Sequence, residues 1–114
     1  MKLWLDDLRP MPKGFDVHAK TVEQALDLLA SEQFDFISFD HDLGTDSNGN
    51  LHLTGYDLAK IIEKKAFEGK MKPLGWAIHS ANPVGRQNIE RAMQNAERFW
   101  NLTPLNPSSC TNPG

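Results

Sequence analysis

Acidic side chains and histidines gather at three points in the chain, each directly after a short apolar run. They are Asp6 and Asp7 after residues 3–5, Asp40, His41 and Asp42 after residues 34–39, and His79 with Ser80 after residues 74–78. If these runs are parallel strands, their carboxyl ends meet at one edge of a sheet, where α/β proteins bind ligands. Carboxylates brought so close repel one another, and a bound cation relieves the repulsion. The pattern therefore predicts a metal site, with oxygen ligands that suit Mg²⁺ or Mn²⁺ and histidines that would also suit another transition metal.

Each of these residues also has a plainer interpretation. An Asp after a strand is often only a loop residue or a helix cap. Asp42 could be a metal ligand or could orient a histidine. His79 or His41 could act as general acid or base, because imidazole titrates near neutral pH, or could only make a structural hydrogen bond.

A phosphate site is predicted where a helix begins after residue 82. The N-terminus of a helix disfavours a cation such as Arg86 unless an anion binds there too. Gly85 would let a phosphate approach the backbone, and Ser80 and Arg9 could bond its oxygens. The alternatives are an Arg86–Glu90 pair, a salt bridge between Arg9 and the nearby acids, and a backbone hydrogen bond for the Ser80 hydroxyl.

Strands and helices alternate along the chain, which predicts a parallel sheet with helices on its faces. The expected strands span residues 3–5, 15–20, 34–39 and 74–78, and the expected helices begin at Thr21, Thr54 and Asn82. Pro10 and Pro12 exclude a helix between the first two strands. A connection this short is unusual between parallel neighbours, so the second strand could be an irregular or antiparallel edge.

The composition is that of one small globular domain. The chain has 114 residues, a net charge of −3 and one cysteine, so there is neither a basic excess for duplex nucleic acid nor a disulfide framework. No apolar run approaches the roughly 20 residues that span a bilayer. We expect a cytoplasmic domain over residues 1–100 and an irregular, uncharged tail over residues 101–114.

The positions of Asp6, Asp7, Asp40 and Ser80 resemble those of a response-regulator receiver domain. In that family the acidic pair and the third-strand Asp bind Mg²⁺, and the third-strand Asp accepts a phosphoryl group that the Ser contacts. The chain departs from the pattern because it lacks the first helix and a convincing fifth strand with its lysine. His41, Asp42 and His79 are also foreign to ordinary receivers.

A closer resemblance covers most of residues 2–93. The matching motifs are LDDLRP at 5–10, SFDHDLG at 38–44, TGYD at 54–57 and HSANPVGR at 79–86. They are similar to those of cyclic-phosphate processing receiver domains. The resemblance implies a metal-dependent phosphoesterase acting on cyclic phosphates in nucleotide or RNA-end metabolism, including bacterial and phage conflict systems.

Together these observations predict a small receiver-like, flavodoxin-like three-layer α/β sandwich with a mostly parallel sheet of about four strands. The expected partner is a small phosphorylated nucleotide or an RNA terminus, held by the metal and by the arginines. Within this pocket Asp40 could be a metal ligand or a covalent nucleophile. A module that binds metal and nucleotide without turnover, or a pseudo-receiver that only binds proteins, remains the alternative, and the oligomeric state is open.

Overall fold

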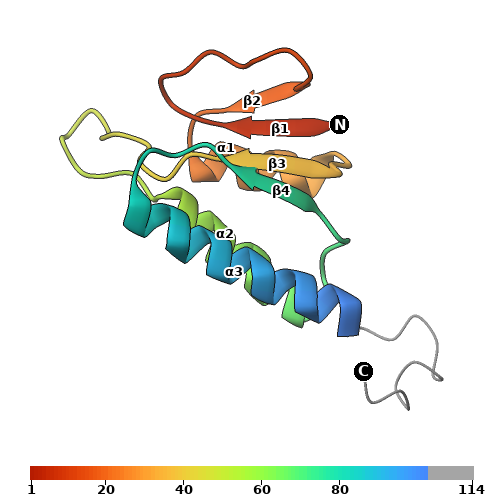
Figure 1. The fold of residues 1–114 in the computed structure, drawn as a ribbon. Coiled ribbons are helices and arrows are strands. Elements are labelled where there is room, and N and C mark those ends of the chain that lie inside the picture. The colour runs from red at the N-terminus through yellow and green to blue at the C-terminus, as the bar shows by residue number, and fades with distance from the viewer. Residues whose placement is uncertain (103–114) are drawn as a thin grey trace.

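A computed structural model of the chain describes residues 1–102. The elements in chain order are β1 (Lys2–Leu5), β2 (Val17–Ala19), α1 (Val22–Ser31), β3 (Phe36–Phe39), α2 (Gly55–Phe67), β4 (Gly75–Ile78) and α3 (Pro83–Leu102) (Figure 1). The last helix continues through Leu102, so it includes the first two residues of the expected tail. The rest of that tail lies outside the described residues. No helix within residues 1–102 is long and apolar enough to cross a membrane.

The four strands form one sheet in the order β2-β1-β3-β4, and every neighbouring pair is parallel. The receiver-like class and the four-stranded sheet are thus confirmed, but the irregular or antiparallel second strand is wrong. The loop 6–16 is long enough to return the chain to the start of β1 without a helix. Asp16 fixes this return, because its backbone N–H donates to the Lys2 carbonyl at 2.9 Å and its carboxylate accepts from the Lys2 N–H at 2.8 Å.

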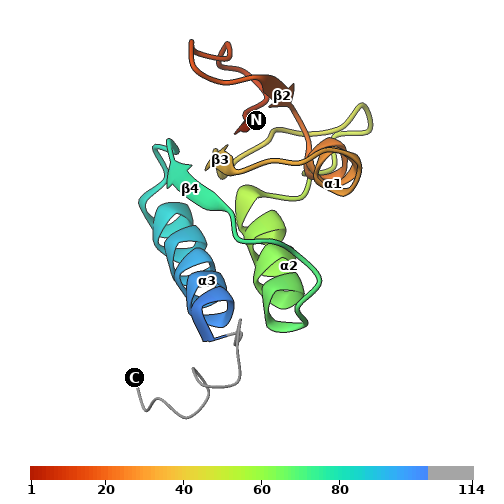
Figure 2. The same ribbon diagram turned by 90° about the vertical axis from the view of Figure 1, so that its right-hand side faces the viewer.

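All three described helices lie on one face of the sheet, with α2 between α1 and α3 (Figure 2). The described residues therefore form two layers, and the expected third layer is not present among them. The reason is topological, because the β2–α1–β3 and β3–α2–β4 connections cross the sheet in the same direction, and right-handed crossovers then share a face. The β1–β2 connection runs the other way, and its prolines leave it without a helix.

The core lies between the helices and one face of the sheet. Leu3, Leu5, Ile37 and Phe39 alternate along β1 and β3, point toward the helices and are fully buried. The helix starts agree with the sequence. Thr54 and Asp57 form a reciprocal capping box at α2, and the Asn82 side chain accepts the Gly85 N–H at 3.0 Å at the start of α3.

The opposite face of the sheet carries aromatic and polar side chains. Trp4 and Ser38 occupy its central strands and are buried. The loop 6–16 covers part of this face, where the Phe15 ring meets Trp4 edge to face with ring centroids 5.1 Å apart. This loop, rather than a helix, therefore shields the residues beneath the predicted metal site.

Candidate functional site: a carboxylate cluster with two histidine networks

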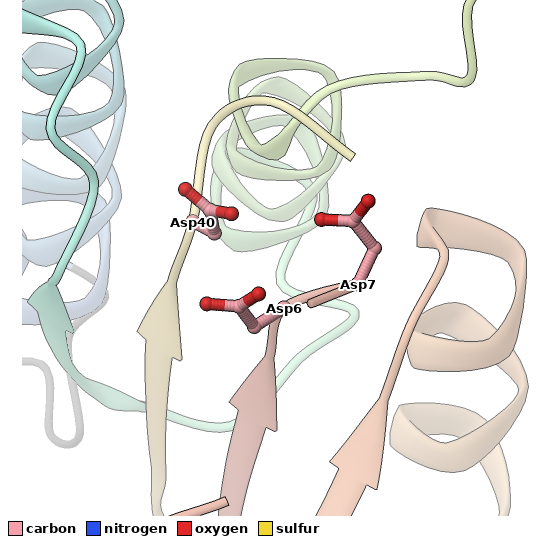
Figure 3. A group of neighbouring side chains, drawn as sticks. All are labelled: Asp6, Asp7 and Asp40. Carbon is pink, nitrogen blue, oxygen red and sulfur yellow. The ribbon is translucent and has the colours of Figure 1, made fainter. Parts of the chain in front are cut away.

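Asp6, Asp7 and Asp40 converge at the carboxyl ends of β1 and β3, as the sequence predicts. Each offers one carboxylate oxygen to a group in which these atoms all lie within 4.8 Å of one another. Figure 3 shows the three side chains around a common space above the two strands. The strand register causes this convergence, because Leu5 pairs with Phe39 and the Asp40 N–H donates to the Leu5 carbonyl at 2.9 Å.

Asp6 is fully buried and its carboxylate is held from several sides. One oxygen, Oδ1, accepts the backbone N–H groups of Leu8 and Arg9, each at 2.8 Å. The other, Oδ2, lies 3.0 Å from His79 Nε2 and 3.6 Å from Arg9 Nη1. Burial raises the pKa of Asp6, but the hydrogen bonds from Arg9, Leu8 and His79 outweigh it and bring the pKa below its usual value. Asp6 is therefore an ionised and fixed ligand candidate.

Asp40 has the opposite electrostatic balance. Burial and the nearby negative charges of Asp6 and Asp7 raise its pKa, and the hydrogen bond from the His41 N–H at 2.9 Å only partly counters them. Asp7 is half-buried, and its carboxylate accepts no hydrogen bond from residues 1–102. Three oxygen donors that repel one another fit a hard divalent cation such as Mg²⁺ or Mn²⁺.

Two glycines make this crowding sterically possible. A Cβ at Gly44 would lie 2.8 Å from Asp7 Oδ2, and Gly44 has a φ of +77°. A Cβ at Gly55 would clash with the Asp40 carbonyl oxygen. The glycines of the 38–44 and 54–57 motifs thus let the loop after β3 and the start of α2 close around the carboxylates.

His79 is engaged at both ring nitrogens. Its Nδ1 lies 2.8 Å from Ser38 Oγ, and its Nε2 faces Asp6. The ring stacks on Trp4 with centroids 3.7 Å apart and an interplanar angle of 7°. Burial lowers the pKa of His79 even though the hydrogen bond and charge of Asp6 act to raise it.

His41 forms a separate network. Its Nδ1 lies 2.9 Å from Asp42 Oδ1, and the Asn82 amide reaches Asp42 Oδ2 at 3.4 Å. Its Nε2 makes no hydrogen bond to residues 1–102. Asp42 lies outside the carboxylate group of the described residues, so the structure pairs it with a histidine rather than with Asp6 and Asp40.

Gly85 packs against the His41 ring and does not face open space. A Cβ at this position would clash with Cγ and Cδ2 of the His41 ring. The space that we expected a phosphate to occupy beside Gly85 is therefore filled by imidazole. The glycine brings α3 and the loop after β3 into contact.

The candidate phosphate-binding side chains bind the backbone around the end of β4. Arg86 Nη1 donates to the carbonyls of Ile78 and Ser80, both at 3.1 Å. Arg9 Nη1 donates to the His79 carbonyl at 2.9 Å, in addition to its ion pair with Asp6. No Arg86–Glu90 ion pair occurs among the described residues. The buried Ser80 hydroxyl accepts the N–H of residue 82 at 3.1 Å, which is the backbone role that we kept as the alternative.

Three residues near the site escaped the sequence analysis. They are Trp4 and Ser38, which hold the His79 ring, and His18, whose Nε2 lies 2.7 Å from the Asp6 carbonyl oxygen. A signal was present, because each alternates with core residues along its strand and so faces away from the helices. Ser38 was the most informative, since it is a polar residue inside the apolar run 36–39.

The parallel sheet carries a carboxylate cluster and two histidines that each contact an aspartate. The family model described as the cyclic-phosphate processing receiver domain matches residues 1–95. The chain belongs to this family. The match to the cyclic-phosphate processing receiver domain includes every site residue discussed above and most of α3. Searches among curated proteins and among solved structures gave no significant match.

Proposed function

We propose that this receiver domain is a metal-dependent phosphoesterase that hydrolyses a cyclic phosphate ester of a nucleotide or an RNA end. The observation that carries the proposal is the convergence of Asp6, Asp7 and Asp40 within 4.8 Å, in a family named for cyclic-phosphate processing. Asp6 and Asp7 would hold the cation from β1, and Asp40 would hold it from β3. When bound, the cation supplies positive charge that polarises the phosphoryl oxygens and helps to activate water.

His41 is the residue best suited to move the proton. Asp42 fixes its Nδ1, as the orienting carboxylate does in general base pairs, and Nε2 is left available by the described residues. In the hydrolysis, the water oxygen bonds to phosphorus as one ring P–O bond breaks. The water proton passes to His41 Nε2, the departing ester oxygen takes a proton from solvent, and His41 then releases its proton to solvent.

The arginines would stabilise the phosphate charge. The Arg86 and Arg9 side chains are each anchored through Nη1 to a backbone carbonyl, so they can direct a remaining N–H toward an anion at little further cost in side-chain entropy. Ser80 and the start of α3 add polar groups beside them.

The proposal is tested with the full chain and a panel of cyclic phosphates. The protein is incubated with 2′,3′-cyclic mononucleotides, RNA ending in a cyclic phosphate, and ADP-ribose cyclic phosphate, each with Mg²⁺ or Mn²⁺. We expect ring opening that is abolished by Asp40→Ala and slowed about 10²–10⁴-fold by His41→Ala. Asp46→Asn is the matched control, because Asp46 accepts N–H groups within its own loop, from Asn48 and Asn50, and should leave turnover unchanged.

The same experiment separates the alternatives. The proposal is refuted if no substrate is opened with either metal. Tight nucleotide binding in that case would favour a module that binds its ligand without turnover. Trapping of a phosphorylated Asp40 during turnover would instead make this residue the covalent nucleophile.

A further inference from the structure

Ser38, His79 and Asp6 form a continuous chain of hydrogen bonds beneath the carboxylate cluster. Ser38 lies in β3, His79 follows β4 and Asp6 follows β1, so the chain links three strands. The two contacts are 2.8 Å from Ser38 Oγ to His79 Nδ1 and 3.0 Å from His79 Nε2 to Asp6 Oδ2. Ser38 and Asp6 are 3% and 0% exposed.

The chemistry of the partners assigns the protons in this chain. The Asp6 carboxylate can only accept, so the contact at 3.0 Å requires a hydrogen on His79 Nε2. In a ring with a single proton, Nδ1 is then the acceptor at 2.8 Å, and the Ser38 hydroxyl donates to it. Ser38 thereby selects the histidine tautomer that donates to Asp6, as the outer partners of metal ligands commonly do.

The position of the ring is fixed as firmly as its tautomer. Trp4 stacks on the His79 ring at 3.7 Å and nearly parallel to it. Arg9 holds the His79 backbone carbonyl at 2.9 Å. With both nitrogens engaged and one ring face covered, His79 has no free atom with which to move a substrate proton.

We propose that His79 is a positioning residue, which Ser38 and Trp4 hold in place so that it fixes the Asp6 carboxylate for a divalent cation. The three residue types are those of a nucleophilic Ser–His–Asp triad, but their roles are reversed. Here the buried serine orients the histidine, and the carboxylate is the group that would bind the cation. This inference rests on the metal site of the proposed function and is independent of turnover.

The decisive experiment compares His79→Gln with His79→Asn in the full chain. The Gln amide nitrogen can stand where Nε2 stands and donate to Asp6, whereas the Asn amide nitrogen stands near Nδ1 and cannot reach it. Mn²⁺ binding is followed by electron paramagnetic resonance of the free ion. We expect the Mn²⁺ dissociation constant to rise about 10–100-fold in His79→Asn and to stay within about threefold in His79→Gln.

Ser38→Ala supplies a second, spectroscopic readout. In the wild-type protein, ¹⁵N chemical shifts should report His79 as the single tautomer protonated at Nε2. Removal of the Ser38 hydroxyl should yield a mixture of tautomers and a weaker Mn²⁺ affinity. A purely structural serine would lower the melting temperature without changing the tautomer.

Each result bears on the inference separately from the proposed function. Equal Mn²⁺ affinities in His79→Gln and His79→Asn, or a wild-type His79 protonated at Nδ1, would overturn it even if cyclic phosphates are hydrolysed. Failure of the wild-type protein to bind Mn²⁺ up to the millimolar range would overturn it as well. The expected order of affinities without any ring opening would uphold the inference and refute only the proposed reaction.

Discussion

Replacement of Asp40 by Asn should stabilise the metal-free protein. In the wild type, burial and the charges of Asp6 and Asp7 raise the Asp40 pKa, so its ionised form is unfavourable in the folded state. Asn removes the charge and keeps an oxygen that can accept the His41 N–H, the 2.9 Å hydrogen bond that Asp40 Oδ1 now makes. The change therefore removes repulsion without removing a known contact.

The magnitude follows from the separations. The cluster oxygens lie within 4.8 Å of one another. A like-charge pair at about 4 Å costs roughly 1 kcal/mol in bulk water and roughly 4 kcal/mol at the effective dielectric of a protein surface. Because Asp40 is half-buried and Arg9 offsets part of the repulsion, we expect a net gain of about 1–2 kcal/mol. The melting temperature should rise about 4–8 °C for each kcal/mol in a small domain.

The pH dependence has a definite sign. A raised pKa in the folded state means that ionised Asp40 opposes folding at neutral pH, whereas below the unfolded value of 3.8 it is protonated in both states. The advantage of Asp40→Asn should therefore be greater at pH 7 than in acid and vanish as the pH falls below about 3.8. Thermal unfolding across this range, followed by circular dichroism in a chelating buffer, measures it.

Asp57→Asn is the matched control, since it makes the same chemical change with the opposite expected result. Asp57 Oδ2 accepts the Thr54 N–H at 2.7 Å in the capping box, and although burial acts to raise its pKa, the hydrogen bonds and Lys60 lower it. Asn keeps an oxygen acceptor there but removes the negative charge from the first turn of α2 and from beside Lys60, which should cost about 0.3–1 kcal/mol at pH 7. A lower melting temperature for Asp40→Asn than for the wild type at pH 7 without metal would refute the electrostatic argument.

Three other outcomes are expected. Millimolar Mg²⁺ or Mn²⁺ should raise the melting temperature of the wild type by mass action and leave that of Asp40→Asn unchanged in differential scanning fluorimetry; an equal rise in both would exclude this site. Gly85→Ala should destabilise the fold by about 1–3 kcal/mol in urea unfolding, because its Cβ would clash with the His41 ring. Val84→Ala, at a position 66% exposed, should change the free energy of unfolding by less than about 0.5 kcal/mol. Arg86→Ala should raise the KM for a cyclic phosphate. Arg86→Lys should restore little of the affinity, because lysine lacks the planar fork in which Nη1 holds the two carbonyls while other N–H groups face an anion. Equal KM values for Arg86→Ala and wild type would remove Arg86 from the phosphate site.

The parts of the site that the sequence predicts are those governed by local pattern. Asp6 and Asp40 each follow an apolar run, and parallel strands place such residues at one edge whatever the details of packing. The caps at Thr54 and Asn82 were likewise readable, since side-chain acceptors at a helix start act on N–H groups within three residues.

The parts that the sequence does not predict depend on contacts between distant segments. The hydrogen bond from His79 to Asp6 spans 73 residues, and only the folded sheet shows that Ser38 occupies the other ring nitrogen. Gly85 illustrates the same limit, because a glycine at a helix start permits close approach without specifying what approaches. The number of layers depended on the crossover directions, which follow from the strand order and not from any single motif.

The loop 6–16 links the architecture to the site. Its prolines prevent a helix, and the extended chain instead carries Arg9 and Phe15 across the exposed face of the sheet. Arg9 reaches the His79 carbonyl, its own carbonyl lies 3.4 Å from Trp4 Nε1, and Phe15 packs on the Trp4 ring. All three contacts hold the ring stack against which His79 is placed. The loop that stands in place of a helix therefore also fixes His79 beside Asp6, the carboxylate that we propose as a metal ligand.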